Sequence, residues 1–266
     1  MHKTQLQDPG TEPILQFRGS GPFSEEAIAH MNVFYTVNSG FYLRSADFGI
    51  LVDGLHRGEQ VGFSAVPQTV RTALNTHTAP FNCPMAFLFT HTHPDHFDPE
   101  SLALAAPSAA VYGPDVGALP FQVIAPGIRK LLLPEGCAYA FQVPHEGKAF
   151  SDVPHHALLI LLDGQCILMA GDGEFSPEIA HTMLEFCPCG VDAVCVNPYQ
   201  LISPSTRAFL SLLHPSSILL SHLPFPQDDK LGCYALADHA IAHYPAGFPP
   251  LTRLTPMSWF HIPLHS

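Results

Sequence analysis

Four side chains that can bind a metal ion fall within six residues of this chain: His91, His93, Asp95 and His96. The apolar segment before them, 85–90, predicts a short buried strand. Asp98 and Pro99 follow, and they predict a helix start because Asp is a favoured N-cap and Pro is favoured at the first helical position. The cluster is therefore expected on a tight connection from a strand to a helix. Imidazole together with carboxylate suits zinc, iron, nickel or manganese rather than calcium.

Other apolar, strand-like segments also end in residues of the ligand type. The segments 139–143, 167–170 and 218–221 are followed by His145, Asp172 and His222. Sites of α/β proteins commonly lie where loops from several strands converge, so these side chains would meet at one cavity if the strands are neighbours with matching direction. His155 stands just before the next apolar run, 157–162, and is an alternative to His145 as a ligand.

Composition and charge limit the kind of protein and partner. The chain has 266 residues, of which 47% are hydrophobic and only 13% are charged, and this predicts a single α/β domain over residues 1–266. The formal net charge is −12, with 11 Lys and Arg against 23 Asp and Glu. Because a nucleic acid or an anionic membrane surface requires clustered cations, neither is an expected partner, and a small-molecule substrate is.

The chain start and the cysteines predict a cytoplasmic protein. Residues 1–10 lack the apolar stretch of a signal peptide, and no apolar run reaches membrane-spanning length. The seven cysteines are scattered through apolar surroundings, so they are expected to be buried thiols in a reducing compartment.

Secondary structure is expected as follows. The segments 40–54 and 157–173 predict two similar hairpins, the second with an Asp163–Gly164 turn. Helices are expected at 24–33, 68–76, 176–186, 205–213 and 229–244, and a closing strand at 257–262.

The segment Leu88–Asp98, with its His-x-His-x-Asp-His pattern after a buried strand, resembles the signature of the metallo-β-lactamase superfamily. Its texture is most similar to the branch of metal-dependent hydrolases that contains the ascorbate-phosphate lactonase. The resemblance implies an αβ/βα four-layer sandwich, in which two facing mixed β-sheets are flanked by helices. The two similar hairpins are consistent with that fold.

The resemblance also implies a ligand set for two divalent transition-metal ions, with zinc expected first and manganese, iron or nickel as alternatives. The first ion would take His91, His93 and His145, the second would take Asp95, His96 and His222, and Asp172 would bridge both. Asp53 would orient a ligand. We favour His145 over His155, and expect the other of the two to line the pocket.

The function implied is hydrolysis of an ester-like bond by metal-bound hydroxide, with Asp95 and Asp172 setting its position and charge. The bond would belong to a lactone, a phosphodiester, a thioester or an amide. Arg57 and Lys148 are candidates to hold an anionic group of the substrate, and Asn197 is either a pocket contact or a turn residue before Pro198. Alternatives are an iron-dependent oxidoreductase of the persulfide dioxygenase type and a non-catalytic, ligand-binding descendant of the fold.

Overall fold

Two β-sheets of the same design form the centre of the molecule. The computed structural model describes residues 31–83, 85–105, 110–114 and 122–262. Within these residues each sheet has seven strands. The first has the order β14 (Ser258–His261), β1 (Asn32–Tyr35), β2 (Phe41–Arg44), β3 (Gly49–Val52), β4 (Met85–Leu88), β5 (Ala110–Pro114) and β6 (Gln122–Ile124). The second has the order β13 (Leu251–Arg253), β12 (Ser217–Leu220), β11 (Ala193–Val196), β10 (Gln165–Met169), β9 (His156–Leu162), β8 (Cys137–Gln142) and β7 (Ile128–Leu132).

Both sheets are mixed, and their pairing patterns match. In the first sheet the pairs from β14 to β3 are antiparallel and those from β3 to β6 are parallel. In the second, β7 to β10 pair antiparallel and β10 to β13 pair parallel. The expected hairpins are β2–β3 and β9–β10. Asp163 and Gly164 turn between β9 and β10 with φ of 52° and 74°, which suits the twist of a two-residue hairpin.

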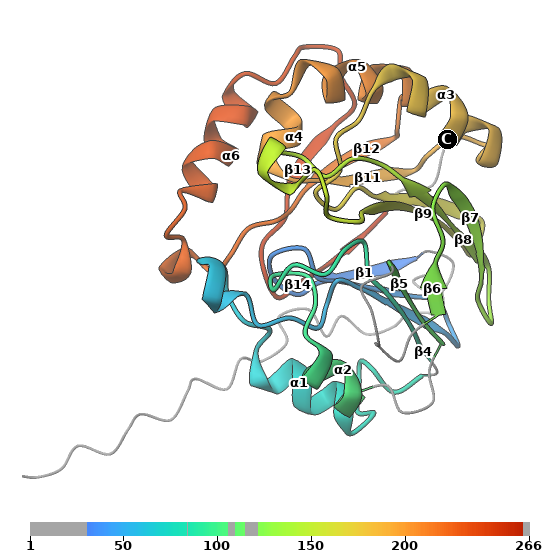
Figure 1. Ribbon diagram of the computed structural model, residues 1–266, viewed down its shortest axis with the longest axis vertical. Coiled ribbons are helices and arrows are strands. Elements are labelled where there is room, and N and C mark those ends of the chain that lie inside the picture. Colours follow the sequence, from blue (N-terminus) through green and yellow to red (C-terminus); the bar gives the residue numbers. More distant parts are fainter. Residues whose placement is uncertain (1–30, 84, 106–109, 115–121, 263–266) are drawn as a thin grey trace, which may run out of the picture.

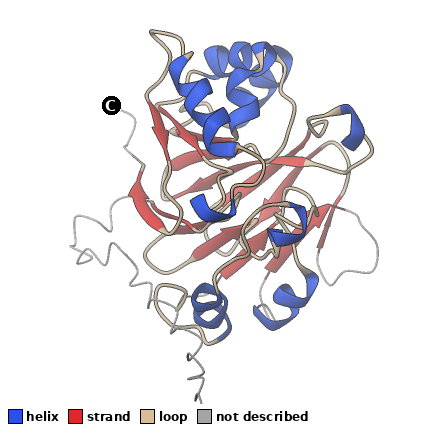
Figure 2. Ribbon diagram, turned by 90° about the vertical axis from the view of Figure 1, so that its left-hand side faces the viewer, coloured by secondary structure: helices blue, strands red, loops and turns tan. Residues whose placement is uncertain are grey.

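Helices cover the outer face of each sheet, so the molecule has four layers (Figures 1 and 2). The helices are α1 (Gln68–Asn75), α2 (Pro99–Ala105), α3 (Pro177–Phe186), α4 (Pro198–Ile202), α5 (Pro204–Leu213) and α6 (Cys233–Ala242), with 3₁₀ turns η2 (Gly58–Val61), η3 (Lys148–Phe150) and η4 (Pro226–Asp228). Helices α1 and α2 pack on the first sheet, and α3, α5 and α6 pack on the second. This arrangement confirms the four-layer sandwich.

Besides the apolar contacts between each sheet and its helices, a hydrophobic core lies between the two sheets. It includes Leu43, Ile50, Ile160 and Ile167, all fully buried. Because both faces of these strands are covered, the central strands are hydrophobic at consecutive positions instead of alternating with polar residues. Burial of this surface is the main term that holds the sheets face to face.

Four of the five expected helices are present, as α1, α3, α5 and α6. The fifth expectation is wrong over the two residues for which the structure describes a strand. The helix expected at 24–33 falls largely outside the described residues, but Asn32 and Val33 lie in β1, between β2 and β14. Val33, Phe34 and Tyr35 are branched or aromatic residues with no exposed surface, and such residues favour a fully covered strand.

Two further expectations concern the cysteines and the membrane. The seven cysteines form no disulfide, and four are buried, but Cys189 is exposed and Cys83 and Cys137 are half-buried, so the expectation that all seven are buried is wrong. Across the described ranges, no helix combines the length and the apolar character needed to cross a bilayer.

Candidate metal centre

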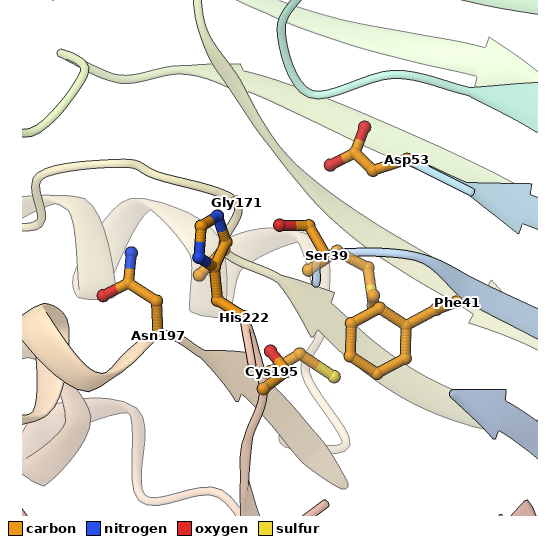
Figure 3. Close-up of a pocket in the computed structure, with 10 residues that line it drawn as sticks. Ser39, Phe41, Asp53, Gly171, Cys195, Asn197 and His222 are labelled. Carbon is orange, nitrogen blue, oxygen red and sulfur yellow. The ribbon is translucent and has the colours of Figure 1, made fainter. Parts of the chain in front are cut away.

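Loops from both sheets bring the predicted ligands together at one edge of the sandwich. β4 leads to the loop that carries His91 to His96, and α2 follows it. Asp98 caps α2, because its carboxylate accepts the Ser101 N–H at 2.8 Å. In the other sheet, β8 leads to His145, β10 to Asp172 and β12 to His222. Figure 3 shows Asn197, Gly171 and His222 on one side of a pocket, with Ser39 and Asp53 on the other.

Two groups of His and Asp side chains there could each hold a metal ion. One is His91, His93, His145 and Asp172, and the other is Asp95, His96, Asp172 and His222. Within each group the ligand atoms lie within 4.8 Å of one another. Asp172 belongs to both groups, so a carboxylate stands where one residue would bridge two ions.

The distances in the first group fit a tetrahedral ion. His93 Nδ1 lies 3.1 Å from His91 Nε2 and 3.2 Å from His145 Nε2. Ligands about 2.0–2.1 Å from a zinc ion in tetrahedral geometry are about 3.3–3.4 Å apart. The two distances from His93 Nδ1 are therefore close to those between ligands of one ion.

Hydrogen bonds on the far side of the rings fix which nitrogen faces the shared point. His145 Nδ1 donates to the Glu146 carbonyl at 2.7 Å, and His91 Nδ1 donates to Thr90 Oγ1 at 3.1 Å. With Nδ1 of each ring engaged in this way, the Nε2 atoms of His91 and His145 both face His93 Nδ1. Ring nitrogens that face one shared point in this way are able to bind a metal ion.

The second group shares the Asp172 carboxylate with the first. His96 Nε2 and His222 Nε2 are 3.2 Å apart, and each lies 3.3 Å from an Asp172 oxygen. Asp95 Oδ2 lies 3.4 Å from His222 Nε2. Asp172 Oδ2 is also 3.7 Å from His91 Nε2 and 3.8 Å from His145 Nε2. The residues present thus fit two divalent ions held side by side.

Asp53 organises the ligands from behind. Its carboxylate accepts the Thr90 N–H at 2.9 Å, the Thr90 hydroxyl at 2.6 Å and the His96 Nδ1–H at 2.9 Å. The bond to His96 leaves Nε2 of that ring free to face Asp172, and the Thr90 hydroxyl is in turn the acceptor for His91. One buried carboxylate therefore orients a histidine of each group, which is the role expected for Asp53.

Three residues of the centre have left-handed backbone conformations. The φ angles are 47° at Asp53, 54° at Gly171 and 60° at His222. Such values are uncommon outside glycine, and they tend to occur at functional sites where the surroundings hold them in place. At Gly171 a Cβ atom would also lie 2.7 Å from His155 Nε2, so only glycine fits.

Electrostatics divide the histidines into two kinds. Burial and the neighbouring His96 lower the pKa of His91, and burial and His145 lower the pKa of His93, so these rings are neutral. Burial opposes charge on His96 and His222 too, but Asp172 and the other carboxylates outweigh it and raise the pKa of both. The pKa of Asp172 is held well below its usual range: burial would raise it, but the histidines, His222 first, lower it.

The structure separates the two histidines that the sequence left as alternatives. His145 is in the first group, whereas His155 Nε2 accepts the Asp172 N–H at 3.0 Å and lies behind Gly171. His155 is 1% exposed and is not among the cavity-lining residues, so the expectation that the second histidine lines the pocket is wrong. Its position instead holds the backbone that carries Asp172.

A cavity of about 510 Å³ opens over the two groups. Asn197 lines it and is also a helix cap: its Oδ1 accepts the Gln200 N–H at 2.9 Å, and its Nδ2 donates to Asp172 at 3.2 Å. Both alternatives for Asn197, pocket contact and turn residue, therefore hold at once.

The two expected cations lie elsewhere. Arg57 is paired with Asp98 at 3.1 Å and Glu100 at 2.7 Å, beside a separate pocket of about 80 Å³. Lys148 is in η3 and does not line the cavity. The sequence argument expected Arg57 and Lys148 at the site only because their loops are close to it in the chain. The ion pairs of Arg57 with Asp98 and Glu100 hold its side chain at the other pocket instead.

Glu146 is a cavity residue that the sequence argument missed. It accepts a hydrogen bond from Asn197 Nδ2 at 2.6 Å, and its N–H donates to the Asp172 carbonyl at 2.8 Å. Burial, then Asp172, raises the pKa of Glu146 to about 8. The available signal was its place next to His145 at a strand exit.

Comparison with known proteins places the fold but gives no closer relative. No protein-family model matches the chain, and no curated protein does. Among solved structures, a metallo hydrolase of the archaeon Ignicoccus hospitalis is 14% identical, with a TM-score of 0.60 over 88% of this chain and 99% of that one. An isothiocyanate hydrolase from Delia radicum gut bacteria is 17% identical, with a TM-score of 0.60 over 87% and 100%.

A third similar structure belongs to an enzyme that is not a hydrolase. It is a diiron β-hydroxylase from Streptomyces venezuelae, 14% identical, with a TM-score of 0.60 over 88% of this chain and 54% of that one. Identities this low establish the fold alone. With its two facing mixed sheets and flanking helices, the chain has the metallo-β-lactamase fold, as its His-x-His-x-Asp-His segment predicted.

The roles of the two histidines can be separated by substitution. His145→Ala is expected to lower the affinity for one metal ion by at least about 10-fold, since a ligand is lost. His155→Ala is expected to act mainly on stability, by about 1–3 kcal/mol, because it leaves the buried Asp172 N–H without an acceptor. Metal affinity is measured by competition with a chromophoric chelator, and stability by denaturant unfolding in EDTA. Loss of metal in His155→Ala with full affinity in His145→Ala would reverse the assignment.

Asp53→Asn tests the hydrogen-bond network behind the ligands. Asparagine tolerates the positive φ at this position, so the change removes the charge without straining the backbone. We expect metal affinity to fall by about 10–100-fold. The matched control is Asp47→Asn, an exposed aspartate in the same hairpin, which should bind metal as the parent does. Equal affinities for the two variants would show that Asp53 does not orient a ligand.

Metal binding should release protons. The raised pKa values of His96 and His222 mean that the metal-free protein carries protons there near neutral pH, and a metal ion must displace them. Apparent affinity should therefore rise with pH through the neutral range. Calorimetric titration with zinc in two buffers of different ionisation enthalpy measures the protons released, and identical heats in both buffers would contradict the expectation.

Proposed function

We propose that this protein is a metal-dependent hydrolase that cleaves an ester-like bond of a small molecule. The observation that carries the proposal is the pair of complete ligand groups that share Asp172 at the base of a cavity of about 510 Å³. That volume falls within the range of pockets that bind small molecules, about 300–1,000 Å³. The hydrolases among the structural neighbours support the same class of reaction.

The residues of both groups would hold two divalent ions, with zinc favoured by the histidine-rich first group. Bound there, such ions lower the pKa of water and polarise a carbonyl or phosphoryl oxygen. Asp172 and Asp95 would supply negative charge to balance the ions. Asn197 keeps Asp172 in place by donating to its Oδ1, and the same amide group holds Glu146 at the cavity wall.

A second candidate is an oxidoreductase that uses iron. It is favoured by the diiron β-hydroxylase among the structural neighbours, and by the donor set itself, because histidine and carboxylate also suit iron. A non-catalytic binding protein is a weaker candidate, since both ligand groups are complete.

Metal analysis and a substrate screen test the proposal. Protein purified without chelator should contain close to two transition-metal ions per chain, and it should hydrolyse at least one generic ester, lactone, thioester or phosphodiester. Chelation should abolish the activity and zinc or manganese should restore it. Oxygen uptake in the presence of ferrous iron, without hydrolysis, would favour the oxidoreductase instead.

Asp172→Asn gives the residue-level test. Loss of the shared carboxylate should lower kcat/KM by at least about 100-fold, since mutation even of residues behind the ligands costs about 10–100-fold. Asp152→Asn, an exposed aspartate on the loop between β8 and β9, is the matched control and should keep the parent activity. Equal activity of both variants would remove Asp172 from the mechanism.

A further inference from the structure

The cavity over the metal centre has an apolar wall. Apart from the ligands, it is lined by hydrophobic side chains from several loops and helices: Val61, Phe63, Phe150, Tyr199, Leu231 and Leu236. These come from η2 and the residues after it, η3, α4, and the start of α6 with the loop before it. The chain segments that close over the site therefore all contribute apolar surface to it.

Two of these rings stand against the ligands themselves. Phe63 packs edge-on to His222, with ring centroids 4.8 Å apart. Phe150 packs edge-on to His93, at 5.1 Å, and against His145, at 5.2 Å. A substrate whose reacting group lies over the shared Asp172 would thus meet a phenyl ring on either side.

Exposure of this wall sets it apart from ordinary surface. Val61 is 41% exposed, Phe150 45%, Tyr199 56% and Leu231 54%. Single exposed apolar residues are common on proteins and require no explanation, but a group of them around one cavity marks a binding surface. Covering these side chains with an apolar ligand would remove them from water.

The side chains that line the cavity offer no permanent positive charge to a strongly anionic occupant. The described lining residues include the acidic residues Asp95, Glu146 and Asp172, and no Lys or Arg. Of the two cations expected at the site, Arg57 is paired with two acidic residues beside a different pocket, and Lys148 does not line the cavity. A phosphodiester would therefore find no positive charge outside the metal ions, in a protein of formal net charge −12.

We propose that the substrate is a neutral carboxylic ester or lactone with an apolar acyl or aromatic group, which lies against the wall formed by Val61, Phe63, Phe150, Tyr199, Leu231 and Leu236. This inference rests on the proposed hydrolase function. One water is consumed: its oxygen bonds to the carbonyl carbon, and the bond from that carbon to the leaving oxygen breaks. One proton of the water goes to the leaving alcohol, and the other is released from the product acid.

A series of p-nitrophenyl esters tests the substrate class. Between the acetate, butyrate and octanoate, kcat/KM of the zinc-loaded enzyme should rise by up to about fourfold per methylene group, the transfer free energy of a CH₂ expressed as a ratio. The hemisuccinate ester, an anionic relative of the butyrate, and bis(p-nitrophenyl) phosphate should both be poor substrates. Equal or better rates with the anionic compounds, and no dependence on chain length, would overturn the inference.

A pair of variants locates the apolar wall. Leu231→Glu places a charge at the cavity, and it should lower the ratio of octanoate to acetate kcat/KM by at least about 10-fold. Leu212→Glu is the matched control, since Leu212 is an exposed leucine on α5 that does not line the cavity. It should keep the parent ratio, and an unchanged ratio in Leu231→Glu would overturn the inference.

Binding separates failure of the inference from failure of the hydrolase function. The neutral dye Nile red should bind the zinc-loaded protein, and octanoic acid methyl ester should displace it more strongly than methyl acetate. If no ester is hydrolysed but this displacement occurs and Leu231→Glu weakens it, the hydrolase function fails and the apolar site stands. If esters are hydrolysed without chain-length preference and the dye does not bind, the hydrolase function stands and the inference fails.

Discussion

A buried carboxylate surrounded by histidines is the interaction on which the rest of this structure depends. Asp172 is buried, and it lies within 3.8 Å of a ring nitrogen of His91, His96, His145 and His222. A charge buried in such surroundings is costly unless it is paired or coordinates a metal. The Asp172 N–H donates to His155 Nε2, and Asn197 Nδ2 donates to the Asp172 carboxylate, so both ends of the residue are held at the point where the two ligand groups meet.

The same centre lies at the seam between the two sheets. The His222 N–H donates to the Asn38 carbonyl at 2.8 Å, and the His156 N–H donates to the Thr90 carbonyl at 2.9 Å. Each bond joins a loop or strand of one sheet to a loop of the other. Because ligands come from both sheets, the metal centre and the packing of the sandwich depend on one another, and metal bound there would stabilise the assembled fold.

Above this centre, the chemistry of the cavity changes from ionic to apolar over a short distance. The ligands, Glu146 and Asn197 form a polar base, and Phe63 and Phe150 begin the hydrophobic wall. A site of this kind separates two tasks. The polar base would act on the reacting group, which is common to many substrates, and the apolar wall would select among them by shape and by the absence of charge.

The sequence by itself predicted the fold class and most of the residues that the structure groups as candidate metal ligands. His91, His93, Asp95 and His96 are close in the chain, on one strand-to-helix loop, so their convergence is local and a pattern of residues suffices to predict it. The hairpins were predictable for the same reason, since Asp163–Gly164 between apolar runs specifies its own turn.

Only the tertiary structure decided between His145 and His155, and whether the expected cations lie at the cavity. His145 follows β8 and His155 directly precedes β9, so both lie near strand ends and either could reach the loop. The deciding factor is the approach of the two sheets, which places His145 beside His93 and sets His155 behind Gly171. Likewise, Arg57 is close to the centre in the chain, but its ion pairs with Asp98 and Glu100 draw it to another surface. Contacts of this kind depend on side chains far apart in sequence, and no local pattern encodes them.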